Sequence, residues 1–211
     1  RNRPAAAGRV KAFWAYVQWL LLAVAGLALS WLVGWQFFAC EIALFVMGVV
    51  YNVPPVRSKD LPYLDVLSES INNPIRLLLG WYAVKCQLLP PATLIFAYWM
   101  LGAFLMAVKR FAELGCIYDR KVAMAYRKSF AHYTRNRLLI CIVFYSSAFA
   151  FFSGAFIIRY HIELILAVPY FAGFLGFYLH LGMLPDSPTH YPESLYKERP
   201  FMIYTGLTVL M

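Results

Sequence analysis

The sequence predicts an all-α fold, a polytopic bundle of about seven transmembrane helices. Hydrophobic residues make up 62% of the 211 residues and charged residues only 14%, whereas about a quarter of an ordinary soluble domain is charged. Apolar stretches long enough to cross a bilayer, about 20 residues each, follow one another without a linker. We therefore expect one transmembrane domain over residues 1–211.

Turn and proline signals separate the expected spans. Gly34 divides the first span from the second, and Pro54-Pro55 exclude a helix in the loop after the second. Pro90-Pro91 open the fourth span, and a Pro-rich loop that ends at Pro200 precedes the seventh. The seven apolar segments cover residues 13–33, 37–50, 64–84, 90–109, 138–158, 162–184 and 201–211.

Positive charge is distributed unevenly between the two ends of these spans. If the chain crosses the membrane at every segment, 16 of the 19 Lys and Arg residues fall on one side, in the N-terminal stretch and in residues 51–64, 109–137 and 185–200. Because loops rich in Lys and Arg stay in the cytoplasm, we expect the basic face in the cytoplasm or the equivalent compartment of an organelle. The membrane would then be a bacterial inner membrane or an organelle membrane.

Both ends of the sequence indicate a piece of a longer chain. The first residue is Arg1 rather than methionine, and no secretory signal with a cleavage site follows it. The seventh apolar segment stops at Met211 after about half the length of a span. We therefore expect truncation at both ends.

The third segment carries an unusual stripe of polar side chains, spaced at i, i+4, i+7, i+8 and i+11. Its members are Asp65, Glu69, Asn72, Asn73 and Arg76. One continuous helix would present all of them on one face, and such residues face the bundle interior or a wet cavity. The stripe predicts a polar cavity for a charged or hydroxylated substrate, and Pro74 would open the helix locally and free a carbonyl. The alternative is a structural Glu69–Arg76 pair with amides that join neighbouring helices. Five polar residues exceed the needs of one pair, so the cavity is favoured.

A basic stretch begins at the inner end of the fourth segment. Lys109 and Glu113 share a helical face, and Asp119 and Arg127-Lys128 follow. Cations bind phosphate oxygens and carboxylates can hold Mg²⁺ that bridges them, so this pattern suits a phosphorylated substrate. On composition alone, positive-inside flanking with contact to anionic lipids ranks first. Nucleic acid ranks behind both because the stretch lies at a membrane face.

Other functional patterns are missing from the sequence. The four cysteines have no CxxC or metal-ligand spacing, and the four histidines are scattered. There is no phosphate-cradling Gly loop, nucleophile elbow or HExxH. A transporter is the weaker interpretation because no internal repeat is visible and the polar groups crowd one face rather than the midplane.

Several separated motifs, in the right order, resemble the UbiA superfamily of intramembrane prenyltransferases. Residues 51–59 read YNVPPVRSK and residues 62–65 read PYLD, similar to the Tyr–Pro–Arg–Lys loop that follows the fourth of nine helices in that family. Residues 109–114 (KRFAEL) and 127–134 (RKSFAHYT) resemble the decaprenyl-phosphate phosphoribosyltransferase branch, which reads K-R-[YF]-A-E-L and then R-K-S…Y-T. Residues 1–8 are similar to the R-P-x-x-x-G stretch after the family's first Asp-rich motif.

The resemblance implies an enzyme that holds a diphosphate with Mg²⁺ on Asp-rich motifs, while a lipid tail lies in a groove open to the bilayer. In the phosphoribosyl branch the donor is phosphoribosyl diphosphate and the acceptor a polyprenyl phosphate. The implied phosphate-holding residues are Lys109, Arg110, Arg127 and Lys128. Glu113 with Asp119 is implied as the metal side of the site, and Lys109, Glu113 and Asp65 are the expected catalytic residues. Tyr51, Arg57 and Lys59 would close the site, and Asp65, Glu69, Asn72, Asn73 and Arg76 would line the cavity.

The sequence departs from the family in two respects, which leave two functions open. The first Asp-rich motif, NDxxDxxxD, and the two helices around it would precede Arg1, and the second motif lacks the DxxxD of the aromatic prenyltransferases. One hypothesis is a UbiA-type transferase that acts on a polyprenyl phosphate or diphosphate. The other is a catalytically incomplete relative that serves as a structural subunit of a larger respiratory or photosynthetic membrane complex. Expected partners are membrane lipids, the polyprenyl substrate and, in the second hypothesis, other membrane subunits.

Overall fold

The fold consists of helices and loops throughout the residues that the structure describes. The structure is a computed structural model that describes residue 8 and residues 11–84, 88–117, 119–190 and 192–210. Most of the N-terminal motif at residues 1–8 therefore lies outside the described residues. The α-helices are α1 (Ala12–Val33), α2 (Trp35–Asn52), α3 (Leu64–Ser70), α4 (Asn72–Val84), α5 (Ala92–Gly115), α6 (Arg120–Tyr126), α7 (Arg135–Tyr160), α8 (Val168–Met183) and α9 (Arg199–Leu210). Short 3-10 helices lie between them: η1 (Ser58–Asp60), η2 (Lys128–Ala131), η3 (Ile162–Ala167), η4 (Pro188–His190) and η5 (Pro192–Lys197).

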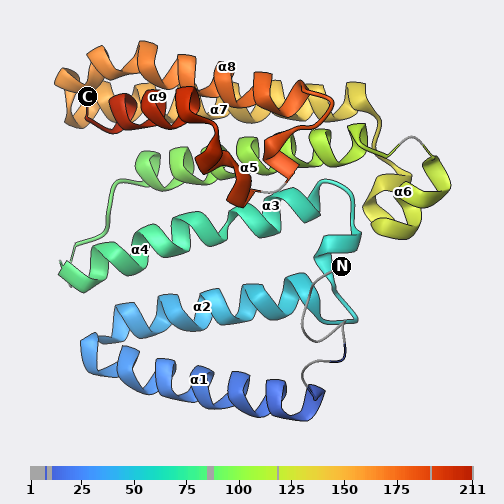
Figure 1. Cartoon of the computed structure of the whole chain (residues 1–211). Coiled ribbons are helices and arrows are strands. Elements are labelled where there is room, and N and C mark those ends of the chain that lie inside the picture. Colours follow the sequence, from blue (N-terminus) through green and yellow to red (C-terminus); the bar gives the residue numbers. More distant parts are fainter. Residues whose placement is uncertain (1–7, 9–10, 85–87, 118, 191, 211) are drawn as a thin grey trace.

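The long helices run back and forth, so alternate loops gather at the same end. Figure 1 shows the loops after α2, α5 and α8 at the right-hand end, which we call the loop end, and the turns after α1, α4 and α7 at the left. Among the described residues, five helical segments are long and apolar enough to cross a membrane: Phe13–Val33, Trp35–Asn52, Ala92–Gly115, Arg135–Tyr160 and Ile162–Met183. The prediction of an all-α membrane helix bundle is confirmed.

Helix α5 is the centre of the packing. It contacts α7 most extensively and also packs on α3, α4 and α8. Ala103 and Ala107 on α5 are fully buried, and such small side chains allow neighbouring helices to approach closely. Gly182 of α8 serves the same purpose, because a Cβ there would lie 2.3 Å from Cγ1 of Val108. The end of α5 is therefore held firmly where it reaches the loop end.

The segment predicted over residues 64–84 is interrupted at Ile71, between α3 and α4, which agrees with the expected local opening by Pro74. The break lies one turn before Pro74, which has no N–H to donate to the carbonyl of residue 70 and whose ring clashes with that carbonyl. The indole N–H of Trp99 on α5 donates to the carbonyl of Leu67, at 3.2 Å, and to Oγ of Ser70, at 3.1 Å. The broken segment is thus hydrogen-bonded to the central helix.

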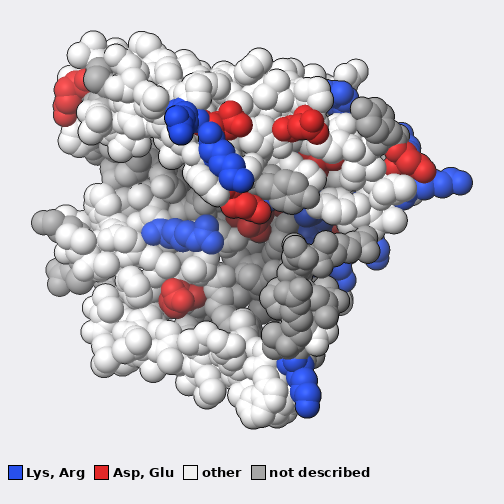
Figure 2. All heavy atoms as spheres, in the orientation of Figure 1, with Lys and Arg blue, Asp and Glu red and all other residues white. Residues whose placement is uncertain are grey.

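Helices α1 and α2 form a hairpin at the edge of the bundle (Figure 1). Gly34 links them with φ 155°, a conformation that other residues rarely adopt. α1 packs on α2, partly through the stacked rings of Trp19 and Phe45, and α2 packs on α4. The outer surface of the hairpin exposes large apolar side chains such as Trp14 and Trp35, and Figure 2 shows a broad uncharged area over it. Lipid is the natural environment for this surface.

Candidate functional site

The loop end of the bundle contains a buried cluster of charges centred on Arg110. Arg110 lies near the end of α5. Its Nε donates to Oδ2 of Asp65, at 3.1 Å, and its Nη1 donates to Oε2 of Glu113, at 2.7 Å. Its Nη2 donates to the hydroxyl of Tyr51, at 3.3 Å. The guanidinium therefore uses all three nitrogens, and the residue is only 2% exposed.

Asp65, in the first turn of α3, is the main acceptor of the cluster. Besides Arg110, its Oδ2 accepts from Oγ of Ser129, at 3.3 Å, and its Oδ1 accepts from the hydroxyl of Tyr133, at 2.6 Å. The residue is fully buried. Its carboxylate thus connects α3, α5, η2 and the start of α7, which are distant in the sequence.

Arg127, between α6 and η2, completes the cluster. Its Nη1 lies 3.9 Å from Oδ2 of Asp65, 3.5 Å from the hydroxyl of Tyr51 and 3.4 Å from the carbonyl of Lys59. Its Nε is buried and has no hydrogen-bond partner among the described residues. Arg127 is partly exposed, whereas Arg110 is closed off, so Arg127 is the guanidinium that keeps donor capacity for a bound anion.

The loop after α2 is shaped by local contacts and by unusual backbone conformations. Arg57 and Tyr63 are non-glycine residues with positive φ, 36° and 66°. Such backbone conformations are strained, and they are found most often at functional sites. Nε of Arg57 pairs with Oδ2 of Asp60 at 3.2 Å, and Nζ of Lys59 donates to Oδ1 of Asn52 at 3.2 Å. The loop therefore turns back over the cluster with Lys59 beside it.

The cluster holds two guanidinium groups and two carboxylates in a largely water-free environment. Such groups are costly to bury unless they are paired and hydrogen-bonded, and here each carboxylate has a guanidinium partner. Burial, and then the neighbouring charge of Asp65, raise the pKa of the Tyr133 hydroxyl well above its usual range. Tyr133 is therefore a proton donor to Asp65 at any physiological pH.

The structure brings together only some of the residues predicted from the sequence. Tyr51, Asp65, Arg110, Glu113 and Arg127 lie in the cluster, with the backbone of Lys59 beside them. The half-buried Lys109 directly precedes Arg110 on α5, but none of the described contacts joins its side chain to the cluster.

Other predicted residues have different surroundings. Lys128 is 80% exposed at its side chain and lies 4.0 Å from Oδ2 of Asp60, next to Arg57. Arg76 is exposed on α4.

The polar stripe is divided by the break at Ile71. Asp65 faces α5 in the cluster, while the half-buried Asn73 packs against Gly102 so closely that a Cβ there would lie 2.0 Å from its Nδ2. Asn72 is buried, and its Oδ1 has no hydrogen-bond partner among the described residues. The half-buried Glu69 and the exposed Arg76 complete the stripe. The stripe therefore faces several surroundings rather than one continuous wall.

The two predicted metal ligands have different partners. Glu113 is buried and paired with Arg110, whereas Asp119 is exposed and its Oδ1 accepts the backbone N–H of Lys121 as the cap of α6. In the part of the chain that the structure describes, no group of three or more His, Cys, Asp or Glu side chains is placed to hold a metal ion. Glu113 and Asp119 therefore do not form a Mg²⁺ site together.

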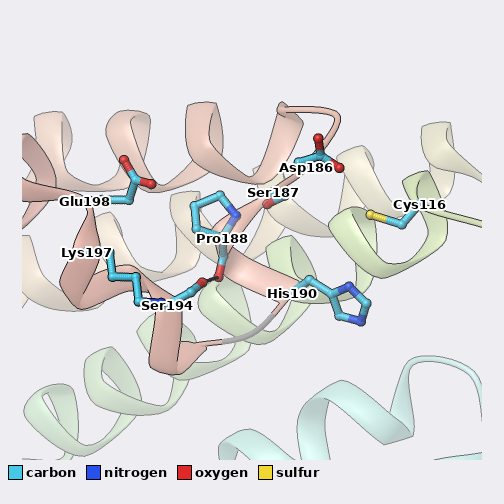
Figure 3. A pocket seen from close by; sticks show the side chains of 8 residues that line it. All are labelled: Cys116, Asp186, Ser187, Pro188, His190, Ser194, Lys197 and Glu198. Atoms are coloured by element: carbon cyan, nitrogen blue, oxygen red, sulfur yellow. Dashed lines mark hydrogen bonds between the residues drawn. The ribbon is translucent and has the colours of Figure 1, made fainter. Parts of the chain in front are cut away.

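A separate hollow of about 330 Å³ lies beside the loop between α8 and α9. Its lining residues are Cys116, Asp186, Ser187, Pro188, His190, Ser194, Lys197 and Glu198. Figure 3 shows the carboxylates of Asp186 and Glu198 pointing to the top of the view, away from Ser194 near the centre. Its charged groups do not converge, and it shares no lining residue with the cluster around Arg110.

Sequence reasoning missed Ser129 and Tyr133 as members of the site. Both lie inside the motif at residues 127–134, so the motif itself was the available signal. The spacing along the chain gave no sign that their hydroxyls would reach Asp65, which precedes them by 64 and 68 residues.

These features define a class of protein: an integral, multi-pass membrane protein whose polar site lies where an apolar helix bundle meets its loops. Residues 1–196 match the UbiA prenyltransferase family, and the chain belongs to that family. A similar solved structure is that of a UbiA homolog from Archaeoglobus fulgidus bound to Cd²⁺, with a TM-score of 0.73 and 17% identity over 100% of this chain and 78% of that chain. This likeness shows the shared fold. None of the curated proteins compared with the sequence matches it.

Proposed function

We propose that this chain is a membrane transferase that acts on a polyprenyl phosphate or diphosphate, and that it transfers phosphoribosyl from phosphoribosyl diphosphate to a polyprenyl phosphate. One observation carries the proposal: Arg127, with a buried and unpartnered Nε, lies at the loop end of an apolar bundle beside Lys59 and the neutralised Arg110. A guanidinium with free donors binds phosphate oxygens in a fork geometry. The apolar helices suit the polyprenyl tail.

In this reaction the bond between C1 of the ribose and the diphosphate oxygen breaks, and the diphosphate leaves with the electron pair. A phosphate oxygen of the lipid forms the new bond to C1. Arg127, with Lys59 in the neighbouring loop, stabilises the negative charge that develops on the departing diphosphate. Arg110 does not contact the anion directly, because it is buried and hydrogen-bonded to Asp65, Glu113 and Tyr51. Its role is to hold Tyr51, to which Arg127 also donates.

The loop end is proposed to face the cytoplasm, where a soluble phosphoribosyl donor is available. The loops after α2, α5 and α8 meet there (Figure 1). Residues 51–64, 109–137 and 185–200, which include these loops, carry 12 of the 19 Lys and Arg residues. Retention of basic loops in the cytoplasm supports this orientation.

The experiment uses the purified chain in lipid nanodiscs with phosphoribosyl diphosphate labelled in the ribose and with decaprenyl phosphate. The expected result is label in the organic extract, lost in Arg127→Gln and retained in Lys197→Gln, which lies in a different loop. Formation of a prenylated product only when a prenyl diphosphate and a labelled aromatic acceptor replace these substrates would contradict the phosphoribosyl assignment. Absence of all transfer, with recovery in fixed stoichiometry with other membrane subunits, would instead favour the structural-subunit alternative.

A further inference from the structure

The hydroxyl of Tyr133 connects two parts of the site that are far apart in the sequence. It donates to Oδ1 of Asp65, at 2.6 Å, and accepts the backbone N–H of Tyr63, at 2.7 Å. Tyr133 lies just before α7 and is 3% exposed. Its ring also meets that of Tyr63 edge-on, with 5.4 Å between centroids. The hydroxyl therefore uses both its donor and an acceptor position on a single short segment, residues 63–65.

This segment determines how the loop after α2 joins the site. Tyr63 has φ 66°, a conformation that costs free energy for a residue with a side chain and persists only where the surroundings hold it. The bond from its N–H to Tyr133 is such a restraint. Arg57 and Lys59 lie within the six residues before Tyr63, so their position depends on this conformation.

Through Asp65, the same hydroxyl also affects the segment after α6, which carries Arg127. Oδ2 of Asp65 accepts from Ser129 and lies 3.9 Å from Nη1 of Arg127. Nη1 of Arg127 in turn donates to the carbonyl of Lys59, at 3.4 Å. Contacts therefore run from Tyr133 to Asp65, from Asp65 to Arg127 and from Arg127 to the loop that carries Lys59, and this loop returns to Tyr133 through the N–H of Tyr63.

We propose that Tyr133 is a positioning residue of the anion site: by holding Asp65 and the backbone of Tyr63, it sets the spacing between Arg127 and the loop that carries Lys59. The proposal rests on the proposed function, in which these two groups bind the diphosphate. Removal of the hydroxyl leaves Oδ1 of the buried Asp65 without its donor and frees the N–H of Tyr63, and unmet buried polar groups of this kind are costly. Without these hydrogen bonds, the spacing between Arg127 and the loop that carries Lys59 is no longer fixed.

The experiment compares Tyr133→Phe with the matched change Tyr178→Phe in the full chain in nanodiscs. Tyr178 is also buried, but its ring packs among Phe104, Phe174 and Phe201. The first measurement is the rate of limited tryptic cleavage after Arg57 and Lys59, resolved by mass spectrometry, with cleavage after Lys197 as internal reference. The second is the affinity for inorganic diphosphate, measured by calorimetry.

Tyr133→Phe is expected to raise cleavage after Arg57 and Lys59 about tenfold, and to weaken diphosphate binding about tenfold, as loss of one hydrogen bond to a charged group predicts. Cleavage after Lys197 stays unchanged, and Tyr178→Phe behaves like the wild type in both measurements.

Three results would overturn the positioning role. The first is wild-type cleavage in Tyr133→Phe. The second is equal acceleration at all three sites, or in Tyr178→Phe, which would indicate general destabilisation. The third is faster loop cleavage with unchanged diphosphate affinity. Failure of the wild type to bind diphosphate would reject the proposed function separately, while the cleavage rates would still decide whether Tyr133 holds the loop.

Discussion

Arg110 and Asp65 form a buried ion pair, with 3.1 Å between Nε and Oδ2 and side chains that are 3% and 0% exposed. The two residues are 45 positions apart in the sequence, on α5 and α3. Because Arg110 also binds Glu113 and Tyr51, the pair connects three helices at the loop end.

The first prediction concerns the contribution of this ion pair to the stability of the fold. Asp65→Asn is expected to lower the free energy of unfolding by about 3 kcal/mol, because it leaves the positive charges of Arg110 and Arg127 buried without one of their counter-ions. Reversible unfolding of the purified protein in mixed micelles measures the change. Asp119→Asn is the matched control, because Asp119 is an exposed helix cap and asparagine caps a helix about as well. An equal loss in both variants would contradict the assignment.

The second prediction separates two neighbouring cations that the sequence alone did not distinguish. Arg127→Gln is expected to weaken the binding of inorganic diphosphate at least about tenfold, as removal of a charge-assisted hydrogen bond predicts. Lys128→Gln is expected to weaken it less than about threefold, because an exposed ion pair contributes little; the Lys128 side chain is 80% exposed. Calorimetric titration of the two variants at one ionic strength provides the comparison, and a larger effect at Lys128 would reject it.

The third prediction concerns the pH dependence of Tyr133. Its pKa is raised above the ordinary value of 10.0, first by burial and then by Asp65. The folded protein thus keeps a proton that the unfolded chain releases above pH 10.0, so this contribution to stability is fully present below that pH and declines as the pH rises further. Stability above pH 10.0 should fall more steeply in the wild type than in Tyr133→Phe. Parallel pH profiles would show that the hydroxyl titrates normally.

The fourth prediction concerns packing rather than the site. Gly102→Ala is expected to destabilise the fold by about 1–3 kcal/mol, the usual cost of overpacking, because the new Cβ would lie 2.0 Å from Nδ2 of Asn73. Asn73→Ala should remove part of this cost when the two changes are combined, since residues in contact are not additive. Additive effects in the double variant would mean that the two side chains do not meet.

The helical bundle was predictable because its signals are local in the sequence. Apolar length defined the spans, Gly34 defined the first turn, and Pro90-Pro91 defined the start of α5. The local opening of the third segment was also predictable from Pro74, because a proline disrupts the helix about one turn before its own position, and the structure has the interruption at Ile71.

The candidate site was predictable only in part, because its geometry depends on contacts between distant residues. The sequence indicated that Asp65, Arg110, Glu113 and Arg127 matter, but assigned Glu113 to a metal and Arg110 to phosphate. Their mutual neutralisation depends on the packing of α3 against α5. No periodicity in a single segment contains that information.

The distribution of the cluster over the chain has a consequence for biogenesis. Tyr51 lies in the last turn of α2, Asp65 in the first turn of α3, Arg110 near the end of α5, and Arg127 after α6. These groups therefore meet only if every intervening helix pair is inserted with the correct topology. A single inverted hairpin would leave unpaired charges on the wrong side or in the hydrocarbon, which is strongly unfavourable. The same ion pairs that shape the site thus discriminate against misinserted chains during assembly in the membrane.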